Sequence, residues 1–229
     1  MIDIRKTYSP GAWTVTVFLF VLLPSLSFCS ETEWKHLFTR DGIDVYRRSS
    51  PETGVYAFKG IGSVEAGIDV VGSVLQDIAG YPQWVARCRE SVVLKEINRD
   101  TRVFYTVIDT PRPFKDRDII LSNTTVYHPN EGLVEINFNV FNQDILPPRE
   151  GYCRVNEFSS QYLIEPLSPD RTRVTFVFKG DPGGNIPVTI ANWVESRTYP
   201  HSIIMGLREM VRKRKCVSAI RADDFTDRN

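Results

Sequence analysis

The stretch that decides the fold is Gly183–Lys215, GGNIPVTIANWVESRTYPHSIIMGLREMVRKRK. Its opening glycines break the preceding strand pattern, Pro187 suits a first helical turn, and apolar residues then recur at helical spacing. The pattern predicts a helix of about seven turns. Its two apolar stripes consist of Ile186, Ile190, Trp193 and Val194, and of Ile203, Ile204, Leu207, Met210 and Val211. Between them lies Pro200, which removes a backbone donor and should kink the helix. Such a helix needs a large apolar partner.

Composition limits the classes of protein to consider. The chain has 229 residues, 42% of them hydrophobic and 24% charged, with a formal net charge of zero. These values predict one globular domain of about 200 residues with a substantial core. They argue against nucleic acid as the partner, because phosphate binding normally requires an excess of basic residues on one face.

The N-terminus has the pattern of a secretory signal. Arg5 and Lys6 precede the apolar run Ala12–Leu23, and small residues follow it. The run is short for a membrane span. We therefore expect residues 1–29 to be a signal peptide, residues 30–217 a folded domain and residues 218–229 a tail, in an exported protein of the periplasm or the extracellular space. The alternative is a membrane anchor formed by the uncleaved segment.

An exported domain can form disulfides. If Cys29 leaves with the signal, Cys88, Cys153 and Cys216 remain. One disulfide and three buried thiols are both compatible with this number. The cysteine spacing matches no zinc site, and we expect neither a metal nor a cofactor.

Between Trp34 and Gly180 most segments resemble strands. Trp34–Arg40 and Ile43–Arg48 flank an Asp-Gly turn and predict a hairpin, and residues 55–66 predict a third strand. Apolar residues recur at helical spacing over Ile68–Ala86, a segment interrupted at Gly80 and Pro82. Further strand patterns cover residues 90–98, 101–109, 118–128, 133–141, 152–158, 161–167 and 172–180. We therefore predict an α+β fold, with nine or ten strands in meander order forming an antiparallel sheet curved around the last helix.

Several motifs, in this order and spacing, resemble the START lipid-transfer domains of the helix-grip superfamily. They are DGIDVYRR at residues 41–48, YPQWV at 81–85, FYTVIDTPRPFKDRDIIL at 104–121, GYCRVNEFSSQYLIEPL at 151–167 and KGDPGGNIPVTIAN at 179–192. The resemblance covers residues 34 to about 215. It implies that the sheet wraps the kinked C-terminal helix and encloses an apolar tunnel for one lipid or other apolar molecule. It also implies that this helix and the loop Thr110–Asp118 gate the tunnel.

The tunnel-facing residues follow partly from the resemblance. It implies that Phe104, Thr106 and Ile108 face the tunnel from one strand and Asn123 from the next. Phe104 and Asn123 stand where related sites carry a buried ionic pair, so the interior should be uncharged. The candidate ligand-binding residues are Trp84, Phe104, Thr106, Ile108, Phe114, Asn123, Phe138, Tyr162, Phe176, Ile190, Trp193, Val194, Ile204 and Leu207.

Charged and exposed residues near the gate have two interpretations each. Arg117 and Asp118 either contact a ligand at the tunnel mouth or, the interpretation we favour, hold the loop through hydrogen bonds. Phe114, which follows Pro111 and Pro113, either packs down or touches a membrane transiently during ligand exchange. The basic run Arg212–Lys215 is a solvated helix end or a contact for anionic lipids, and we favour the former.

No known catalytic motif occurs in the sequence. The three histidines are isolated, and the patterns of serine hydrolases, dinucleotide-binding folds and P-loops are missing. We predict a monomeric, non-catalytic lipid-binding or lipid-transfer protein. The alternative is an enzyme of the polyketide aromatase or cyclase type, in which His201 or Tyr162 would perform acid–base chemistry.

Overall fold

The computed structural model describes residues 33–49, 54–141, 143–181, 183–184, 186 and 198–213. All of them belong to a compact unit that begins at Glu31. The predicted signal peptide, the tail 218–229, Cys216 and the predicted ligand-binding residues Ile190, Trp193 and Val194 lie outside the described residues.

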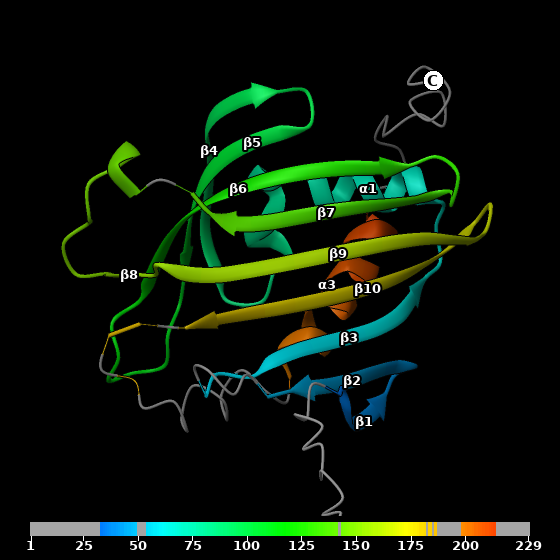
Figure 1. Ribbon diagram of the computed structural model, residues 1–229, viewed down its shortest axis with the longest axis horizontal. Helices are drawn as coiled ribbons and strands as arrows, with labels where there is room; N and C mark the ends of the chain where they lie inside the picture. The colour runs from blue at the N-terminus through cyan, green and yellow to red at the C-terminus, as the bar shows by residue number, and fades with distance from the viewer. Residues whose placement is uncertain are drawn as a thin grey trace, which may run out of the picture. The chain divides into compact units, whose positions relative to one another are not determined.

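A large sheet carries the fold, with the helices on one of its faces (Figure 1). The strands are β1 Lys35–Arg40, β2 Ile43–Arg48, β3 Ala57–Val64, β4 Cys88–Asn98, β5 Thr101–Ile108, β6 Arg117–His128, β7 Leu133–Val140, β8 Cys153–Arg154, β9 Glu157–Ser168 and β10 Arg171–Asp181. The helices are α1 Ile68–Gln76, the 3-10 turns η1 Ile78–Gln83 and η2 Gln143–Ile145, and α3 Tyr199–Lys213. The antiparallel sheet and the C-terminal helix confirm the predicted helix-grip architecture.

The strand order is β1-β2-β3-β10-β9-β7-β6-β5-β4, with β8 pairing with β6 in parallel. The predicted meander order is therefore wrong at two points. First, β3 pairs with β10, and the chain crosses to the other edge of the sheet through α1 and η1. Second, β8 does not lie between β7 and β9, which pair with each other. Alternation of apolar and polar residues fixes which face of a strand is buried, but it does not say which strands are neighbours. The predicted strand 152–158 also divides, because β9 begins only at Glu157.

Strand β7 shows how the sequence sets the two faces of the sheet. Val134, Ile136 and Phe138 are buried, whereas Asn139 on the opposite face is exposed. This confirms the alternation in the sequence, and it places the buried face toward the helices.

The early helical segment changes type sooner than predicted. Helix α1 ends at Gln76, one turn before Gly80, and η1 follows with Pro82 inside it. The hydroxyl of Tyr81 donates a hydrogen bond to the Leu75 carbonyl at 2.5 Å. This bond satisfies one of the carbonyls that a helix end leaves without a main-chain donor.

Helix α3 packs across the sheet face through two sets of contacts. Its residues Ile203, Leu207 and Met210 join the main core, whereas Ile204 packs against Ile43 and Val45 of β2. Pro200 is the second residue of the described helix, a position that requires no main-chain donor. The segment 187–197 lies outside the described residues, so the kink and the length of seven turns stay predictions.

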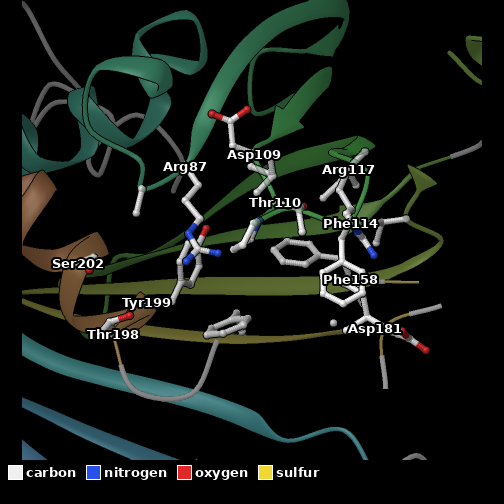
Figure 2. Close-up of a pocket in the computed structure, with 18 residues that line it drawn as sticks. Arg87, Asp109, Thr110, Phe114, Arg117, Phe158, Asp181, Thr198, Tyr199 and Ser202 are labelled. Carbon is white, nitrogen blue, oxygen red and sulfur yellow. The ribbon is translucent and has the colours of Figure 1, made fainter. Parts of the chain in front are cut away.

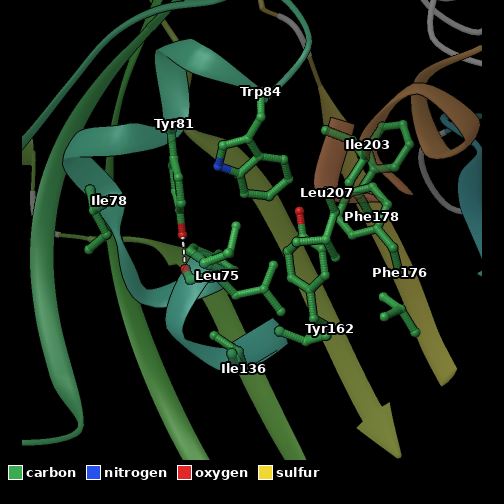
Figure 3. Packing of buried hydrophobic residues seen from close by; sticks show 14 of the residues in the cluster. Leu75, Ile78, Tyr81, Trp84, Ile136, Tyr162, Phe176, Phe178, Ile203 and Leu207 are labelled. Carbon is green, nitrogen blue, oxygen red and sulfur yellow. Dashed lines mark hydrogen bonds between the residues drawn. The ribbon is translucent and has the colours of Figure 1, made fainter. Parts of the chain in front are cut away.

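Aromatic rings form a continuous row through the core, from η1 across the sheet to α3. Adjacent ring centroids lie 6.0 Å apart for Tyr81 and Phe104, 6.0 Å for Phe104 and Phe138, 5.8 Å for Phe138 and Tyr162, 4.7 Å for Tyr162 and Phe176, 5.7 Å for Phe176 and Phe178, and 5.0 Å for Phe178 and Tyr199. Figure 3 shows the part of this core around Trp84, Tyr162 and Leu207. The row ends beside a cavity.

Candidate functional site

A cavity of about 180 Å³ lies at one end of the sheet (Figure 2). It is bounded by the loop between β5 and β6, the last residues of β10 and the first turn of α3. Its lining residues are Ala86, Arg87, Ile108, Asp109, Thr110, Pro111, Phe114, Arg117, Ile119, Val155, Phe158, Phe178, Gly180, Asp181, Ile186, Thr198, Tyr199 and Ser202.

The walls of the cavity are mostly apolar because strands present their buried faces to it. Ile108 ends β5, Ile119 lies near the start of β6 and Phe178 lies near the end of β10. Phe158 comes from β9, and in Figure 2 its ring lies next to that of Phe114. An apolar recess with a few polar groups at its rim is the usual form of a small-molecule site.

The loop that covers the cavity is held by a carboxylate. Asp116 Oδ1 accepts a hydrogen bond from the Thr110 main-chain nitrogen at 3.0 Å, and Asp116 Oδ2 accepts one from Arg89 Nη1 at 2.9 Å. The Thr110 hydrogen bond, followed by the charge of Arg89, holds the pKa of Asp116 below its ordinary value of 3.8. Phe114, half-buried, points from this loop into the cavity.

Arg117 and Asp118 belong to the first residues of β6, so the loop is two residues shorter than predicted. The Arg117 guanidinium lines the cavity and donates to the main-chain carbonyls of Lys115 and Gly183, the latter at 3.0 Å. Asp118 is fully buried and accepts from Arg154 Nη2 at 2.8 Å and from Arg154 Nε at 3.0 Å. The hydrogen bond to Lys115 confirms that Arg117 holds the loop, whereas the side chain of Asp118 pairs with β8. A ligand contact of either residue stays a prediction.

The structure brings together only part of the predicted ligand-binding set. Ile108 and Phe114 line the cavity. Six other residues of the predicted set belong to the main hydrophobic core, which begins beside the cavity. They are Trp84, Phe104, Phe138, Tyr162, Phe176 and Leu207. Thr106 and Asn123 are buried on β5 and β6, and Ile204 lies in the separate cluster against β2. A direct ligand contact of these residues stays a prediction.

Several lining residues were not predicted. Val155 and Phe158 lie inside the quoted motif GYCRVNEFSSQYLIEPL, and Tyr199 and Ser202 form the first turn of α3. The two-residue alternation of a strand over residues 153–160 could have indicated that Phe158 faces the interior. Tyr199 gave no such signal, because it lies between the two apolar stripes of the predicted helix.

Apart from the buried charges of Arg117, Asp118 and Arg154, several polar groups in the interior are neutral. Thr106 donates to the Glu90 carbonyl at 3.0 Å, while Asn123 Nδ2 has no hydrogen-bond partner in the described part of the chain. Burial raises the pKa of Tyr162 well above its ordinary value of 10.0, so its hydroxyl stays protonated. The Asn123 amide and the protonated Tyr162 hydroxyl can donate hydrogen bonds to an uncharged polar atom.

The residues considered for other chemistry lie elsewhere. His201 Nε2 is 2.8 Å from Asp41 Oδ2 in the turn between β1 and β2, and it does not line the cavity. Cys88 and Cys153 are free thiols. Among the described residues, no cluster of side chains is suited to hold a metal ion, and no helix is long and apolar enough to cross a membrane.

A family model for the START domain matches residues 27–216. The chain belongs to the START domain family. Among the relatives of this START protein are an uncharacterised protein of Pseudomonas aeruginosa, 28% identical over 80% of this chain and 88% of the relative, and the bovine phosphatidylcholine transfer protein, 27% identical over 80% and 84%.

Solved structures agree with this membership. A STAR-related lipid transfer protein from Xanthomonas axonopodis has a TM-score of 0.72 and 27% identity, covering 78% of the START chain described here and 98% of its own. The aromatase/cyclase Zhui from Streptomyces has a TM-score of 0.50 at 14% identity, which shows a common fold alone.

Proposed function

We propose that this START protein binds a lipid or another apolar molecule in its cavity without chemical conversion, and transfers it. The observation that carries the proposal is the apolar cavity between the loop and α3, which continues the aromatic row of the core. Transfer of apolar ligand surface from water into such a site contributes about 25 cal/mol per Å². A lipid chain buried along this row would gain several kcal/mol by the same reasoning.

The size of the cavity supports a gated mechanism. Its volume of about 180 Å³ is below the range of roughly 300–1,000 Å³ that is common for ligand sites. Entry of a lipid therefore requires the covering side chains to move. The loop Thr110–Asp116 and the first turn of α3 are the two elements that cover the cavity, and we propose that they separate to admit the ligand.

The relatives suggest which ligands to test first. The bovine relative is named for phosphatidylcholine transfer, and the Xanthomonas structure for lipid transfer. We propose a phospholipid as the first candidate. Neutral hydrogen-bond donors such as the Asn123 side-chain amide suit ester carbonyls.

The enzymatic alternative has less support. An aromatase or cyclase would need the side chain of His201 or Tyr162 beside its substrate. A neighbouring ionisable group would also be needed to shift the pKa of that side chain. His201 instead contacts Asp41 and does not line the cavity, and Tyr162 is kept protonated by burial. We therefore propose a carrier.

The test blocks the cavity and measures transfer. Ala86 lines the cavity from the turn before β4, so Ala86→Phe places a ring in it. The full chain is assayed for transfer of fluorescent phosphatidylcholine, sterol and fatty acid between vesicles. We expect a tenfold or larger loss for whichever ligand the wild type transfers, in line with the cost of overpacking a filled site, about 1–3 kcal/mol.

The matched control is Val92→Phe, which adds similar bulk at a side chain that is 47% exposed on β4. It should transfer as the wild type does. A wild type that neither transfers any of the three ligands nor co-purifies with an extractable lipid would contradict the proposal, as would equal activity of Ala86→Phe.

Phe114→Asp tests the gate separately, and unchanged transfer in this variant would count against a role of the loop.

We also propose export, on the basis of the N-terminal sequence alone. N-terminal sequencing of the protein from the periplasm or medium of its host should find a start near residue 30. Recovery of the intact N-terminus from the membrane fraction would favour the anchor instead.

A further inference from the structure

Two cations share one aromatic ring at the edge of the sheet. Arg48 Cζ lies 4.6 Å from the centroid of the Trp34 ring, and Lys59 Nζ lies 4.5 Å from the same centroid. Lys59 Nζ is also 4.7 Å from the centroid of the Tyr46 ring. The four side chains, all half-buried, form one cluster, which we call the β2–β3 patch.

Among the described residues, the two cations of this patch belong to the basic side chains without a carboxylate partner, as do Arg47 and Arg87, and they lie close to each other over one ring. Seven other arginines have carboxylate partners within 4 Å, namely Arg40, Arg89, Arg102, Arg149, Arg154, Arg171 and Arg173. Arg48 and Lys59 have no such partner in the described part of the chain. Burial and then the charge of Arg48 lower the pKa of Lys59, so the two cations destabilise each other. A bound anion would relieve this repulsion.

The position of the patch leaves it accessible. In β2, Tyr46 and Arg48 alternate with Val45, which is buried against α3. In β3, Lys59 alternates with the fully buried Phe58. The patch therefore lies on the sheet face that is turned away from the helices. Lys59 pairs with Val177, the residue before the cavity-lining Phe178, so patch and cavity lie at the same end of β10.

We propose that Trp34, Tyr46, Arg48 and Lys59 form a surface that binds the anionic phospholipid head groups of a bilayer. Arginine and lysine bind phosphate oxygens, and tryptophan and tyrosine favour the boundary between head groups and acyl chains. Half-buried rings that already support the cations suit this boundary, whereas a site for a free anion would not need them. The surface is separate from the cavity, and the proposal holds whichever ligand the cavity takes.

Vesicle binding by the full chain tests the proposal. Co-sedimentation is measured with phosphatidylcholine vesicles that contain or lack phosphatidylglycerol, and neutral vesicles report any binding through the apolar N-terminal segment. The quantity of interest is the increment in binding, that is, the additional binding to vesicles that contain phosphatidylglycerol compared with vesicles that lack it. Replacing both cations in Arg48→Gln/Lys59→Gln should lower this increment about 30-fold, because each basic residue near an anionic surface contributes roughly fivefold.

The control removes the same charge from the same face. Arg171→Gln/Arg173→Gln lies on β10 beyond the patch, where both arginines are paired with glutamates. It should retain wild-type binding. The wild-type increment should also fall as salt rises from about 0.05 to 0.5 M. Thermal melts verify that both variants are folded.

Three outcomes would overturn the proposal. One is equal binding by the patch variant and the wild type, and another is an equal loss in the control variant, which would indicate a general effect of net charge. The third is displacement of the protein from vesicles by millimolar glycerol phosphate, which would indicate a site for a small soluble anion.

Discussion

The carboxylate of Asp116 accepts a hydrogen bond from the main-chain nitrogen of Thr110, with Asp116 Oδ1 and Thr110 N 3.0 Å apart. The bond joins the two ends of the segment that carries Phe114 over the cavity. The second oxygen of Asp116 contacts Arg89 of β4, so the same carboxylate also ties this segment to the sheet. When the loop moves to open the cavity, the contact between Asp116 and Arg89 must break or Arg89 must move with the loop.

Replacement of Asp116 by alanine removes both acceptor oxygens and should therefore loosen the loop, whereas asparagine would keep an oxygen that can accept from the Thr110 amide. We expect the Thr110 amide to exchange its hydrogen about fivefold faster, since one hydrogen bond contributes a net of roughly 1 kcal/mol. Lipid transfer should accelerate in parallel. The control is Asp109→Ala, which also loses a contact with Arg89, at 3.2 Å, but leaves the Thr110 hydrogen bond in place. Equal exchange rates in both variants would show that the Thr110 bond does not limit opening.

The same bond predicts a dependence on pH. Because the pKa of Asp116 is lowered in the folded protein, its contribution to stability is complete above the ordinary value of 3.8 and is lost as pH falls through the lowered value. The Thr110 amide chemical shift should titrate with a midpoint below 3.8 in the wild type. In Asp116→Asn this titration should vanish. A midpoint above 3.8 would mean that the carboxylate is not stabilised as described.

The buried ion pair of Asp118 and Arg154 should control stability rather than ligand binding. The side chains are 1% and 9% exposed, so replacing Asp118 by asparagine leaves the Arg154 guanidinium with its charge largely uncompensated. We expect a loss of about 3–5 kcal/mol in the free energy of unfolding. A double-mutant cycle with Arg154→Met, measured by urea unfolding, separates the interaction free energy of the two side chains from the stability changes of the single variants. A loss below about 1 kcal/mol, the value of an exposed pair, would contradict this view.

Much of this fold could be predicted from the sequence, because burial of one face makes apolar residues recur at a fixed spacing along each strand or helix. The two-residue alternation of β7 and the Asp-Gly turn between β1 and β2 gave faces and a hairpin that the structure confirms. Long-range neighbours leave no such local pattern. The pairing of Phe176 with Gly60 could not be predicted, since many strands offer the same apolar face.

The candidate site was harder to predict than the fold. Ile203 and Ile204 are adjacent and equally apolar, yet Ile203 joins the main core and Ile204 packs against β2. A helix pattern gives the width of the buried surface but not which part of it meets the cavity. The role of Asp116 was likewise missed, because its partners Thr110 and Arg89 become neighbours only when the loop folds.

His201 provides a test that separates a carrier from an enzyme. Its ring contacts Asp41 Oδ2 at 2.8 Å, which joins α3 to the β1–β2 turn. In His201→Gln we expect unchanged lipid transfer and a melting temperature lowered by a few degrees, as for the loss of about 1 kcal/mol. Asp41→Asn should behave in the same way. A loss of activity in His201→Gln with an unchanged melting temperature would support the enzymatic alternative.

The docking of α3 depends on a glycine beside the main chain of the η1 segment. A Cβ atom added to Gly206 would overlap the main-chain oxygen of Trp84, and a change of side-chain rotamer cannot relieve a clash with a main-chain atom. An exchange of glycine for alanine inside a helix normally stabilises it by about 1 kcal/mol. Here we expect Gly206→Ala to lower the free energy of unfolding by about 1–3 kcal/mol, because α3 must shift away from Trp84.

Met205→Ala, at a side chain 37% exposed on the same helix, is the control and should change stability by less than about 0.5 kcal/mol. If α3 gates the cavity as proposed, the shifted helix in Gly206→Ala should also speed lipid transfer at temperatures well below its melting point. Destabilisation with unchanged transfer would assign the gate to the Thr110–Asp116 loop alone. A variant more stable than the wild type would contradict the close approach of α3 to Trp84.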